Sequence, residues 1–528
     1  MKQRISDFIA KRLSLESAFV AKPKDAAFGH FCTPAAFALS KGTGKTPNLI
    51  ALDLCAKLQD SEMFESVTAD GGYVNFTLSL RFLDHFATKA LYDNDRFGSE
   101  SGGESVLLEF VSANPTGPLH IGHARGAVFG DALARLGRHL GHRVASEYYI
   151  NDAGNQIELL GRSVYFKAKT ELLGEKIAFP EECYQGDYVS DLAKEAFDMF
   201  GRAAFASEET IENLSGWAKN KMLDWIKTTL SEADIKFDNF VSERALYIGW
   251  DRVRSILEKN DALYVDAERK EYLASSRKGD SKDRVVVREN GIPTYLAGDI
   301  IYHHNKFERR FDRYINIWGA DHHGYIARVK AAIEFLGYDS GRLEVLLSQM
   351  VALLKGGEPY KMSKRSGNFV PMEEVGREIG YDALKFVFLT KRADTHLEFD
   401  LDLLAKEDSS NPVYYVNYAH ARICSLFEKL GRSPDIDTPL VDLSGGAKEL
   451  LFYALLLPEV ITEAFNSRQP HLVTDYLYKL SGRLHRFYAD NRVIGSANEE
   501  QILKVFAVVR LAIWQGLRLL GIKAKTKM

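Results

Sequence analysis

The stretch from residue 106 to residue 150 constrains the fold more than any other part of the chain. An apolar run, Val106 to Val111, has the composition of a buried parallel strand. Turn-forming residues follow, and then a helical apolar pattern runs from about His123 to Leu140, where Gly141 supplies the stop. A second apolar run, Val144 to Ile150, completes a strand–loop–helix–strand unit. In a doubly wound parallel sheet, the loop after the first strand of such a unit is where a nucleotide binds.

The loop before this helix carries the sequence His120-Ile121-Gly122-His123. Gly122 lets a ligand approach the backbone, and the N-terminus of the helix offers N–H groups to phosphate. His120 and His123 can both face one ligand and donate hydrogen bonds without a permanent charge. The alternative is a pair of capping or partly buried histidines beside an ordinary turn. A motif this short also occurs by chance, so alone it does not identify a function.

A second motif, Lys361-Met362-Ser363-Lys364, lies far downstream between two glycine-containing segments. Lys361 and Lys364 can meet a polyphosphate from one side and offset the charge that develops when pyrophosphate leaves. A lysine-rich loop is most often only a solvated loop. The two motifs together, in this order, are a far more specific pattern than either of them alone.

The two motifs resemble the signature sequences of class I aminoacyl-tRNA synthetases. Three further features resemble the arginyl-tRNA synthetases in particular: Tyr149 to Gln156, Asn411 to Arg422, and the chain end at Met528. The resemblance runs nearly from end to end. It implies an arginine–tRNA ligase, an enzyme that activates L-arginine with ATP and Mg²⁺ and transfers it to the 3′-terminal adenosine of tRNA(Arg), releasing AMP and pyrophosphate. It also implies that arginine activation requires bound tRNA.

At 528 residues, the chain is long enough for three or four domains. The resemblance implies an α/β fold class. Residues 1–100 are expected to be a small α/β N-terminal domain that contacts tRNA, although a purely structural appendage is an equal alternative. Residues 105–400 are expected to be a Rossmann-like catalytic domain, with an insertion at about 160–285 that handles the tRNA acceptor end. Residues 401–528 are expected to be an all-α anticodon-binding bundle.

Hydrophobic periodicity predicts further elements in these regions. Helices are predicted near the N-terminus, from Pro47, and at Asn213–Ala233, Val413–Leu430, Ala447–Phe465 and Leu472–Tyr488. Strands are predicted after the Gly71-Gly72 turn, near Ala262–Tyr272 and Arg284–Glu289, and at Tyr314–Trp318 and Leu346–Val351. The last helix is predicted to open with a capping box, Ser496 to Glu499, and to run to about Leu520. Trp217 and Trp225 are interpreted as core residues rather than as platforms for stacking bases.

The resemblance implies the ATP site. Catalysis is expected from His120, His123, Lys361 and Lys364. The full ATP-binding set is Pro118, Leu119, His120, Gly122, His123, Met350, Val351, Lys361, Met362, Ser363 and Lys364, with Met350 and Val351 beside adenine. Many arginyl enzymes lack the second lysine and carry a compensating lysine before the first motif. Here Lys364 is present and residues 112–119 contain no lysine, so the chain resembles the bacterial type with an intact loop.

Arginine needs a planar carboxylate partner for its guanidinium group and an aromatic or hydroxyl wall beside it. Asp299 and Tyr295, four residues apart at a predicted strand-to-helix turn, can supply the two, and the resemblance places the specificity pair there. Asp299 could instead cap the following helix. The resemblance also puts Glu109 near the α-amino group and Asn114 near the substrate, although Asn114 is equally an Asx-turn candidate. The full arginine-binding set is Glu109, Ser112, Asn114, His123, Tyr295, Asp299, Asp321 and His323.

The cluster Asp321-His322-His323 could be read as a metal site. No third well-spaced ligand is visible, and a strand end in this fold is a ligand position in any case, so no metal site is expected. The four cysteines, Cys32, Cys55, Cys183 and Cys424, are scattered, which argues against zinc and disulfides and favours a reducing compartment. The first residues lack an apolar segment and no apolar run reaches the length of a membrane span. A cytoplasmic protein without a membrane partner is expected.

The net charge of −4 excludes a generally basic nucleic-acid coat, so RNA binding must depend on local patches. One such patch lies between Asn411 and Phe427, where no acidic residue occurs. The predicted anticodon-binding residues there are Tyr414, Tyr415, Tyr418, His420 and Arg422, which suit unpaired bases through stacking and cationic contacts. The alternative is a helical-bundle core that contains a few tyrosines.

Two other functions remain open from the sequence. One is a class I synthetase of another specificity, such as cysteinyl or glutamyl. The missing zinc ligands count against the first, and the pairing of Tyr295 with Asp299 suits a cationic side chain better than an anionic one. The other is an RNA-binding relative without catalysis, against which the intact motifs argue. A monomer is expected.

Overall fold

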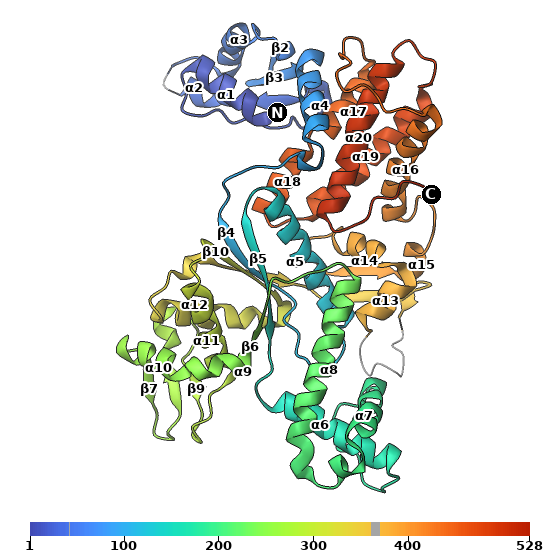
Figure 1. Cartoon of the computed structure of the whole chain (residues 1–528). Helices are drawn as coiled ribbons and strands as arrows, with labels where there is room; N and C mark the ends of the chain where they lie inside the picture. Colours follow the sequence, from blue (N-terminus) through green and yellow to red (C-terminus); the bar gives the residue numbers. More distant parts are fainter. Residues whose placement is uncertain (42, 361–369) are drawn as a thin grey trace. The chain divides into compact units, whose positions relative to one another are not determined.

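The computed structural model describes residues 1–41, 43–360 and 370–528 (Figure 1). They form two compact units, Glu100–Glu407, and Met1–Ser99 together with Asp408–Met528. The predicted phosphate-binding residues Lys361, Met362, Ser363 and Lys364 lie outside the described residues. Among the helices in the described ranges, none combines the length and the apolar character that a membrane span requires.

A five-stranded parallel sheet is the centre of the unit Glu100–Glu407. Its strands are β4 (Ser105–Glu109), β5 (Arg143–Ile150), β6 (Asn239–Ser242), β10 (Arg313–Gly319) and β11 (Leu343–Ser348). They lie in the order β11-β10-β4-β5-β6, which is the doubly wound arrangement that was predicted. The strand order reverses between β4 and β10, and ligands of such folds bind at the carboxyl ends of the two strands at that point.

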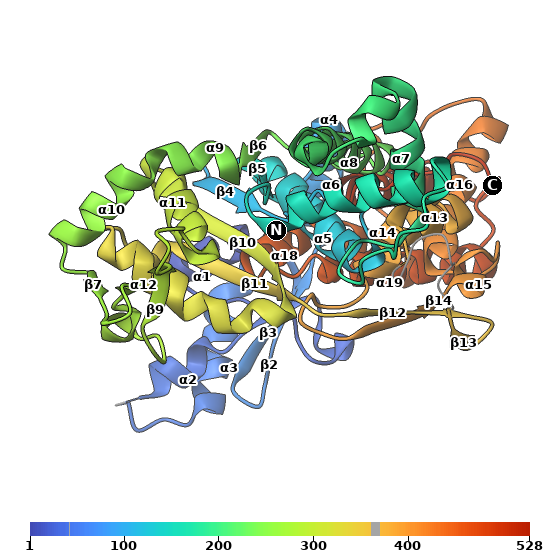
Figure 2. The same cartoon turned by 90° about the horizontal axis from the view of Figure 1, so that it is seen from below.

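Residues of β4 alternate between the two faces of the sheet. Phe110, just after β4, packs on α5 (Ile121–His139), where a Cβ added to Gly130 would lie 2.2 Å from its ring. Leu107 faces the other way and joins Phe307 of α11 (Tyr295–Glu308) and Val329 of α12 (Ile326–Phe335) in one apolar cluster. The sheet is therefore covered on both faces (Figure 2).

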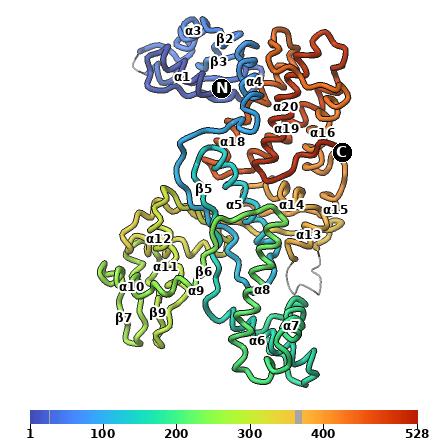
Figure 3. Tube along the Cα trace, viewed as in Figure 1, coloured from blue at the N-terminus to red at the C-terminus, as the bar shows by residue number. Residues whose placement is uncertain are grey.

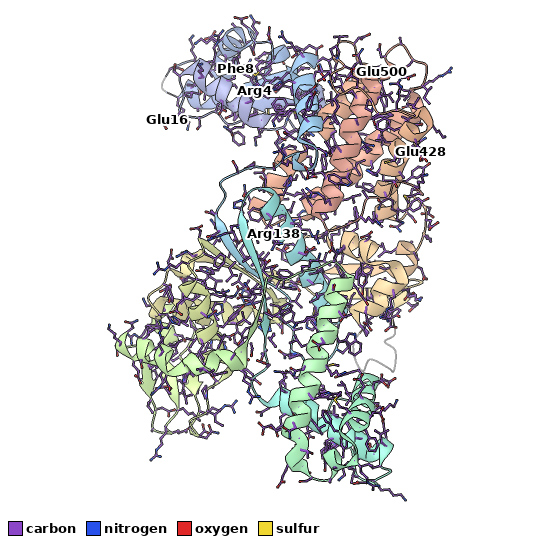
Figure 4. All side chains as sticks on the ribbon, in the orientation of Figure 1. Arg4, Phe8, Glu16, Arg138, Glu428 and Glu500 are labelled. Atoms are coloured by element: carbon purple, nitrogen blue, oxygen red, sulfur yellow. The ribbon has the colours of Figure 1, made fainter. Side chains whose placement is uncertain are left out.

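The C-terminal end of α5 is tied to the neighbouring strand. Arg138, labelled in Figure 4, donates to the backbone carbonyl of Val144 at 3.2 Å and to Asp238 at 2.7 Å. Asp238 in turn accepts from the backbone N–H of Ser146 on β5 at 2.7 Å. These bonds link α5, β5 and the entry to β6, so the predicted strand–helix–strand unit is anchored at the end remote from its loop.

The region predicted as an insertion contains two clusters and one strand of the main sheet, β6, which the sequence did not predict. The first cluster is α6 (Asn155–Lys167), α7 (Asp187–Phe200) and α8 (Ile211–Glu232), and Trp217 and Trp225 pack against its core. The second comprises α9 (Glu243–Leu246), α10 (Trp250–Lys259) and an antiparallel sheet of β7 (Leu263–Val265), β8 (Glu271–Leu273) and β9 (Arg284–Val287). The two tryptophans are half-buried against this core, as the core interpretation requires. The predicted strand near 262–272 is in fact two strands, β7 and β8, whereas the predicted strand near 284–289 corresponds to β9.

The predicted single strand Leu346–Val351 is wrong. β11 ends at Ser348, and the chain enters a second sheet of β12 (Val351–Lys355), β13 (Glu358–Pro359) and β14 (Leu397–Asp400). The crossover at Gln349 is fixed from both sides, because its N–H donates to Ala393 at 2.9 Å and its carbonyl accepts from Arg125 of α5 at 3.1 Å. The remaining helices of this unit are α13 (Met372–Ile379), α14 (Tyr381–Phe388) and α15 (Leu401–Leu404).

The other unit combines the two ends of the chain. Its N-terminal part has helices α1 (Lys2–Leu13), α2 (Ala35–Ser40), α3 (Pro47–Leu58) and α4 (Leu80–Asp93), with an antiparallel sheet of β1 (Phe31–Thr33), β2 (Phe64–Asp70) and β3 (Tyr73–Leu78). Its C-terminal part has helices α16 (Pro412–Leu430), α17 (Gly445–Ala454), α18 (Leu457–Asn466), α19 (His471–Asp490) and α20 (Glu499–Leu519). α4 lies beside α20 (Figure 3), where the buried Lys504 of α20 donates to Asp84 of α4 at 2.6 Å.

Two sequence predictions fail in the C-terminal part. The predicted helix Ala447–Phe465 is divided into α17 and α18, because Pro458 has no N–H and occupies the second position of a new helix. The predicted capping box is absent: the Ser496 hydroxyl donates to the carbonyl of Val493 at 2.8 Å, and the helix begins only at Glu499. The carboxylate of Glu499 accepts instead from the N–H of Gly495 at 2.5 Å.

Candidate active site

The backbone is strained immediately after β4. Val111 (φ 68°) and Ser112 (φ 44°) both adopt the left-handed region, which is unusual for a β-branched residue and is typical of functional sites. This kink turns the Ser112 hydroxyl back, so that it donates to Glu109 Oε1 at 3.0 Å and accepts from the N–H of Tyr149 at 3.1 Å. The end of β4 is thus fixed to the neighbouring strand, β5.

The two histidines of the first motif lie at the start of α5. His120 is the N-cap, and its Nδ1 accepts from the N–H groups of Gly122 at 3.1 Å and His123 at 3.3 Å. In a neutral His120 ring the proton is therefore on Nε2. The rings of His120 and His123 stack with their centroids 3.6 Å apart. The capping alternative thus describes His120 correctly. In this role the His120 ring lies at the N-terminus of α5.

Both rings are neutral at physiological pH. Burial lowers the pKa of His123 to about 3, with a smaller contribution from His120, and burial also lowers the pKa of His120. The Nδ1 atom of His123 is buried and has no hydrogen-bond partner within the described ranges. The pair can therefore donate hydrogen bonds to phosphate oxygens beside the positive end of the α5 dipole without adding a charge.

The segment that follows the second motif pairs with the first motif. The N–H of Ile121 donates to the carbonyl of Val370 at 2.9 Å, and the N–H of Met372 donates to the carbonyl of Leu119 at 2.7 Å. Residue 370 is the first described residue after the second motif. Residues 370–372 therefore lie at the N-terminus of α5.

Asp299 lies inside α11, in its second turn, and Thr294 is the N-cap, so the capping alternative for Asp299 is wrong. Burial raises the pKa of Asp299 to about 7, and the negative charges of Glu243 and Glu109 add to the effect. Burial likewise raises the pKa of Glu243 to about 7. Glu243 is buried and Asp299 is half-buried. Two such carboxylates with raised pKa values are suited to a cationic ligand, whose charge takes the place of the bound protons.

Glu243 is a candidate site residue that the sequence reasoning missed. It is the first residue of α9, directly after the unpredicted strand β6. Its Oε1 accepts from the hydroxyl of Tyr247 at 3.3 Å, and its Oε2 is buried without a partner in the part of the chain that the structure describes. A Cβ added to Gly298 of α11 would lie 2.3 Å from Oε1, so the carboxylate touches the helix that carries Asp299. The sequence signal for Glu243 was an acidic residue at the end of a strand. That signal could be used only if β6 had been recognised as a strand.

Other predicted arginine-binding residues lie on α11, at the end of β4 and in the loop that follows β4. Tyr295 is 46% exposed at the first turn of α11, and its hydroxyl lies 3.4 Å from where a Cβ on Gly154 would be. The side-chain amide of Asn114 donates to Gln156 at 2.5 Å. Glu109 is 4% exposed and forms a buried ion pair with Lys306 of α11.

The carboxyl end of β10 leads into a short 3₁₀ helix, Ala320–Tyr325, that carries Asp321 and His323. Both side chains are exposed, and Asp321 lies 3.5 Å from His322. Within the described ranges, no group of three His, Cys, Asp or Glu side chains is arranged to hold a metal ion. The structure thus places Asp321 and His323 at the edge of the sheet where the strand order reverses.

The predicted ATP-binding residues that the structure describes fall at two places, which one side chain connects. Pro118, Leu119, Gly122 and both histidines are at the start of α5, whereas Met350, 71% exposed, and Val351 are at the crossover between β11 and β12. Arg125 of α5 is 1% exposed and donates to the carbonyls of Gln349 at 3.1 Å and Arg392 at 2.8 Å. It therefore fastens the crossover to the helix whose N-terminus carries the first motif.

The predicted anticodon-binding residues lie on α16. A pocket in this unit is lined by Ser409, Tyr414, Tyr415, Tyr418, Arg422 and His485. Arg422 lies 3.9 Å from the ring centroid of Tyr488, and the rings of Tyr418 and His485 stack at 5.5 Å. His420 does not line the pocket: it is buried, and its Nδ1 meets the carbonyl of Lys525 at 2.8 Å. His485 was missed because it comes from α19, which only the tertiary fold brings beside α16.

Three family models match the chain. They are the arginyl tRNA synthetase N terminal domain at residues 1–78, the catalytic domain of class I (R) tRNA synthetases at residues 87–400, and the DALR anticodon binding domain at residues 416–528. The arginine–tRNA ligase of a Nitratiruptor species is 60% identical over the whole of both chains. That of Wolinella succinogenes is 54% identical over 97% of both.

Solved structures agree with these matches. A Campylobacter jejuni protein assigned to the arginyl-tRNA synthetases is 54% identical and superposes with a TM-score of 0.82, covering 85% of this chain and all of that one. The arginyl-tRNA synthetase of Thermus thermophilus is 22% identical and has the same fold, with a TM-score of 0.78 over the whole of both chains. From these matches and the doubly wound catalytic sheet, the chain belongs to the arginyl-tRNA synthetase family.

Proposed function

We propose that the site at the carboxyl ends of β4 and β10 activates L-arginine with ATP and transfers it to the 3′-terminal adenosine of tRNA(Arg). The chain is an aminoacyl-tRNA ligase, as its family membership establishes. The observation that carries the proposal for the site is the juxtaposition of two parts. A helix N-terminus with two neutral histidines follows β4, and a carboxylate pair, Asp299 of α11 and Glu243 of α9, lies near Glu109 at the end of the same strand.

In the proposed first step, a carboxylate oxygen of arginine attacks the α-phosphorus of ATP, and pyrophosphate leaves. Catalysis consists of positioning and electrostatic stabilisation, and no protein nucleophile is needed. His120 and His123 donate to the phosphates at the N-terminus of α5, together with the backbone of Pro118, Leu119 and Gly122. Met350 and Val351 flank adenine. We assign the remaining ATP contacts to Lys361, Met362, Ser363 and Lys364, and ATP enters as its magnesium complex.

Arginine is proposed to lie across the reversal point of the sheet. Asp299 and Glu243 bind the guanidinium group, for which two carboxylates are suited, and Tyr295 forms the wall beside it. Glu109, oriented by Ser112, binds the α-ammonium group. Asn114, His123, Asp321 and His323 complete the proposed arginine site. An anionic side chain would be repelled by the carboxylate pair, which disfavours a glutamyl specificity.

In the proposed second step, a ribose hydroxyl of the terminal adenosine attacks the carbonyl carbon of arginyl-adenylate, and AMP leaves. We assign residues 105–400 to catalysis, with an insertion at about 160–285 for the acceptor end. Residues 1–100 and 401–528 are assigned to contacts with the tRNA body and the anticodon. We further propose that the protein is a cytoplasmic monomer.

The reaction is tested by charging total tRNA with radiolabelled arginine and by ATP–pyrophosphate exchange with and without tRNA. Arginine-specific charging is expected, with exchange that appears only when tRNA is added. Charging with another amino acid instead would keep the class and discard the proposed guanidinium site. Exchange at full rate without tRNA would contradict the tRNA requirement.

The pocket between α16 and α19 is proposed to receive an unpaired base of the anticodon. Its lining combines aromatic rings, which stack on bases, with the guanidinium of Arg422, which can contact a base or a phosphate. His485 joins Tyr414, Tyr415, Tyr418 and Arg422 in this assignment. His420 acts only through the packing of α16, because it is buried against the C-terminal segment.

Replacing Arg422 with alanine is expected to raise the KM for tRNA about 10-fold, since a cationic stacking contact contributes about 1–2 kcal/mol. The KM for arginine at saturating tRNA should not change. The measurement is steady-state charging with purified tRNA(Arg). Arg432→Ala is the matched control, because Arg432 lies just beyond the same helix and pairs with Glu499 at 2.9 Å outside the pocket. Equal effects of the two substitutions would show that the pocket has no special role.

A further inference from the structure

A row of polar side chains crosses the central sheet on the face that α11 covers. In register, Asn316 of β10, Glu109 of β4 and Glu147 of β5 lie side by side. Each carboxylate has a cation from α11 or its C-terminal end: Lys306 of α11 pairs with Glu109, and Arg309, the residue directly after α11, donates to Glu147 Oε1 at 2.8 Å. Two ion pairs thus have their carboxylates on adjacent strands. The pair of Lys306 and Glu109 is buried and is next to the proposed arginine site, whereas Arg309 in the other pair is partly exposed.

Lys306 is completely buried, with 0% of its surface exposed. Its Nζ donates to Glu109 Oε2 and, at 2.8 Å, to Asn316 Oδ1. The ring of Tyr302 covers a further side, with its centroid 4.2 Å from Nζ. Burying an ammonium group is costly unless it is paired, and these contacts use its donors. Lys306 therefore acts through Glu109 and does not itself reach a ligand.

Glu109 is held from two directions. One carboxylate oxygen accepts from Lys306, and the other accepts from the hydroxyl of Ser112, which the left-handed backbone of residues 111 and 112 turns toward it. His303 adds no charge to this group, because burial and Lys306 lower the pKa of His303 to about 3. The carboxylate plane is consequently fixed before any ligand arrives, which is the condition for recognising a group that forms directed hydrogen bonds.

We propose that Lys306 is a positioning residue for amino-acid recognition: it holds Glu109 as an oriented carboxylate that receives the α-ammonium group of arginine. The inference rests on the proposed role of Glu109. It assigns a function to a lysine that contacts neither ATP nor arginine and that resembles, in sequence, an ordinary helix residue. The neighbouring pair of Arg309 and Glu147 combines the same two charges one strand away, on β5.

The test separates recognition of the α-ammonium group from binding of the rest of arginine. The probe is 5-guanidinopentanoic acid, which keeps the guanidinium and carboxylate groups of arginine and lacks the α-amino group. Its inhibition constant and the KM for arginine are measured in tRNA charging by the full-length protein at saturating ATP and tRNA. The ratio of the two constants reports the preference for the α-amino group.

Lys306→Met is expected to raise the KM for arginine about 10-fold and to leave the inhibition constant of the probe unchanged, so the preference is lost. Lys306→Arg should restore most of it. Glu109→Gln should lower the preference similarly. Arg309→Met, the matched control, should lower the melting temperature while keeping the preference of the unmodified chain.

Each outcome decides between the two assignments. If Lys306→Met weakens arginine and the probe equally, the lysine is only structural and the inference is overturned. If Glu109→Gln keeps the preference, the proposed role of Glu109 fails and the inference falls with it. If Glu109→Gln lowers the preference for the α-amino group and Lys306→Met does not, the role of Glu109 stands and the role inferred for Lys306 fails. Should Lys306→Met not fold, Asn316→Ala removes one acceptor of Nζ, and an unchanged preference in that variant overturns the inference.

Discussion

Replacing Asp299 with asparagine is expected to raise the KM for arginine about 100-fold and to leave the KM for ATP unchanged. The substitution preserves shape and removes the charge, so a charge-assisted pair with guanidinium, worth about 1.5–3 kcal/mol, is lost. Glu243 remains, and arginine binding is therefore weakened rather than abolished. The measurement is steady-state charging at saturating tRNA.

Glu308→Gln provides the control, because Glu308 ends the same helix and pairs at 2.7 Å with Arg252 on the surface. It should leave both constants unchanged. An unaltered KM for arginine in Asp299→Asn would remove Asp299 from the guanidinium site. A large rise in the KM for ATP would show that the substitution disturbs the sheet and not one ligand.

The same variant should alter the pH dependence of arginine binding. Burial raises the pKa values of Asp299 and Glu243 to about 7, so protons compete with guanidinium up to neutral pH and not only in acid. The KM for arginine should therefore rise as the pH falls through 7, by up to about tenfold per pH unit for each group that must lose its proton. Asp299→Asn removes one of the two groups that bind a competing proton. The KM for arginine should therefore change less steeply with pH in this variant. If the KM for arginine depended on pH as steeply as in the unmodified protein, the proposal that Asp299 and Glu243 together bind the guanidinium group would be contradicted.

Replacing His123 with alanine is expected to lower kcat for ATP–pyrophosphate exchange about 100- to 1,000-fold. A preorganised donor in a water-poor site contributes about 2.7–4 kcal/mol to the transition state. His123 is held by its stacking on His120 and by the first turn of α5, so its ring is oriented before ATP binds. His123→Asn, which retains an N–H donor, should recover part of the activity. If kcat for His123→Asn were no higher than kcat for His123→Ala, His123 would act through packing and not as a hydrogen-bond donor.

The protonation state of His123 can be checked in the unmodified protein. Because its pKa lies at about 3, kcat at saturating substrates should not titrate between pH 8 and pH 6. A decline with a midpoint near 6.5 would show that a cationic or titrating histidine takes part. The KM for arginine changes over the same range, so the two constants must be separated.

The local parts of the site could be predicted from the sequence, because the strand, helix and turn between residues 105 and 150 rest on periodicity and on a short motif. Strand β6 could not, since its four residues are all at least partly exposed and carry no buried apolar run. Glu243 was lost with it. In the sequence, Lys306 cannot be told apart from any other lysine of a helix. Only the fold shows that α11 lies on the sheet and that Lys306 faces Glu109. His485 likewise depends on which helices are neighbours.

Two errors were of another kind. Pro458 was visible in the sequence and marks a boundary, but the apolar pattern on both sides of it continues at helical spacing. At Gln349, the apolar run extends from β11 into β12, and the change of sheet is imposed by hydrogen bonds from distant segments. A pattern of hydrophobic residues reports burial and does not report which sheet buries them.

Arg125 has a consequence for how ATP is selected. Its guanidinium joins the helix that presents the phosphate-facing N-terminus to the crossover that carries the proposed adenine contacts. The two ends of the proposed nucleotide site are therefore connected directly, and the distance between them is set during folding. Such a site selects nucleotides by their length. A nucleotide with the correct distance between base and phosphates binds without first ordering the protein. A shorter or longer nucleotide contacts only one of the two ends of the site.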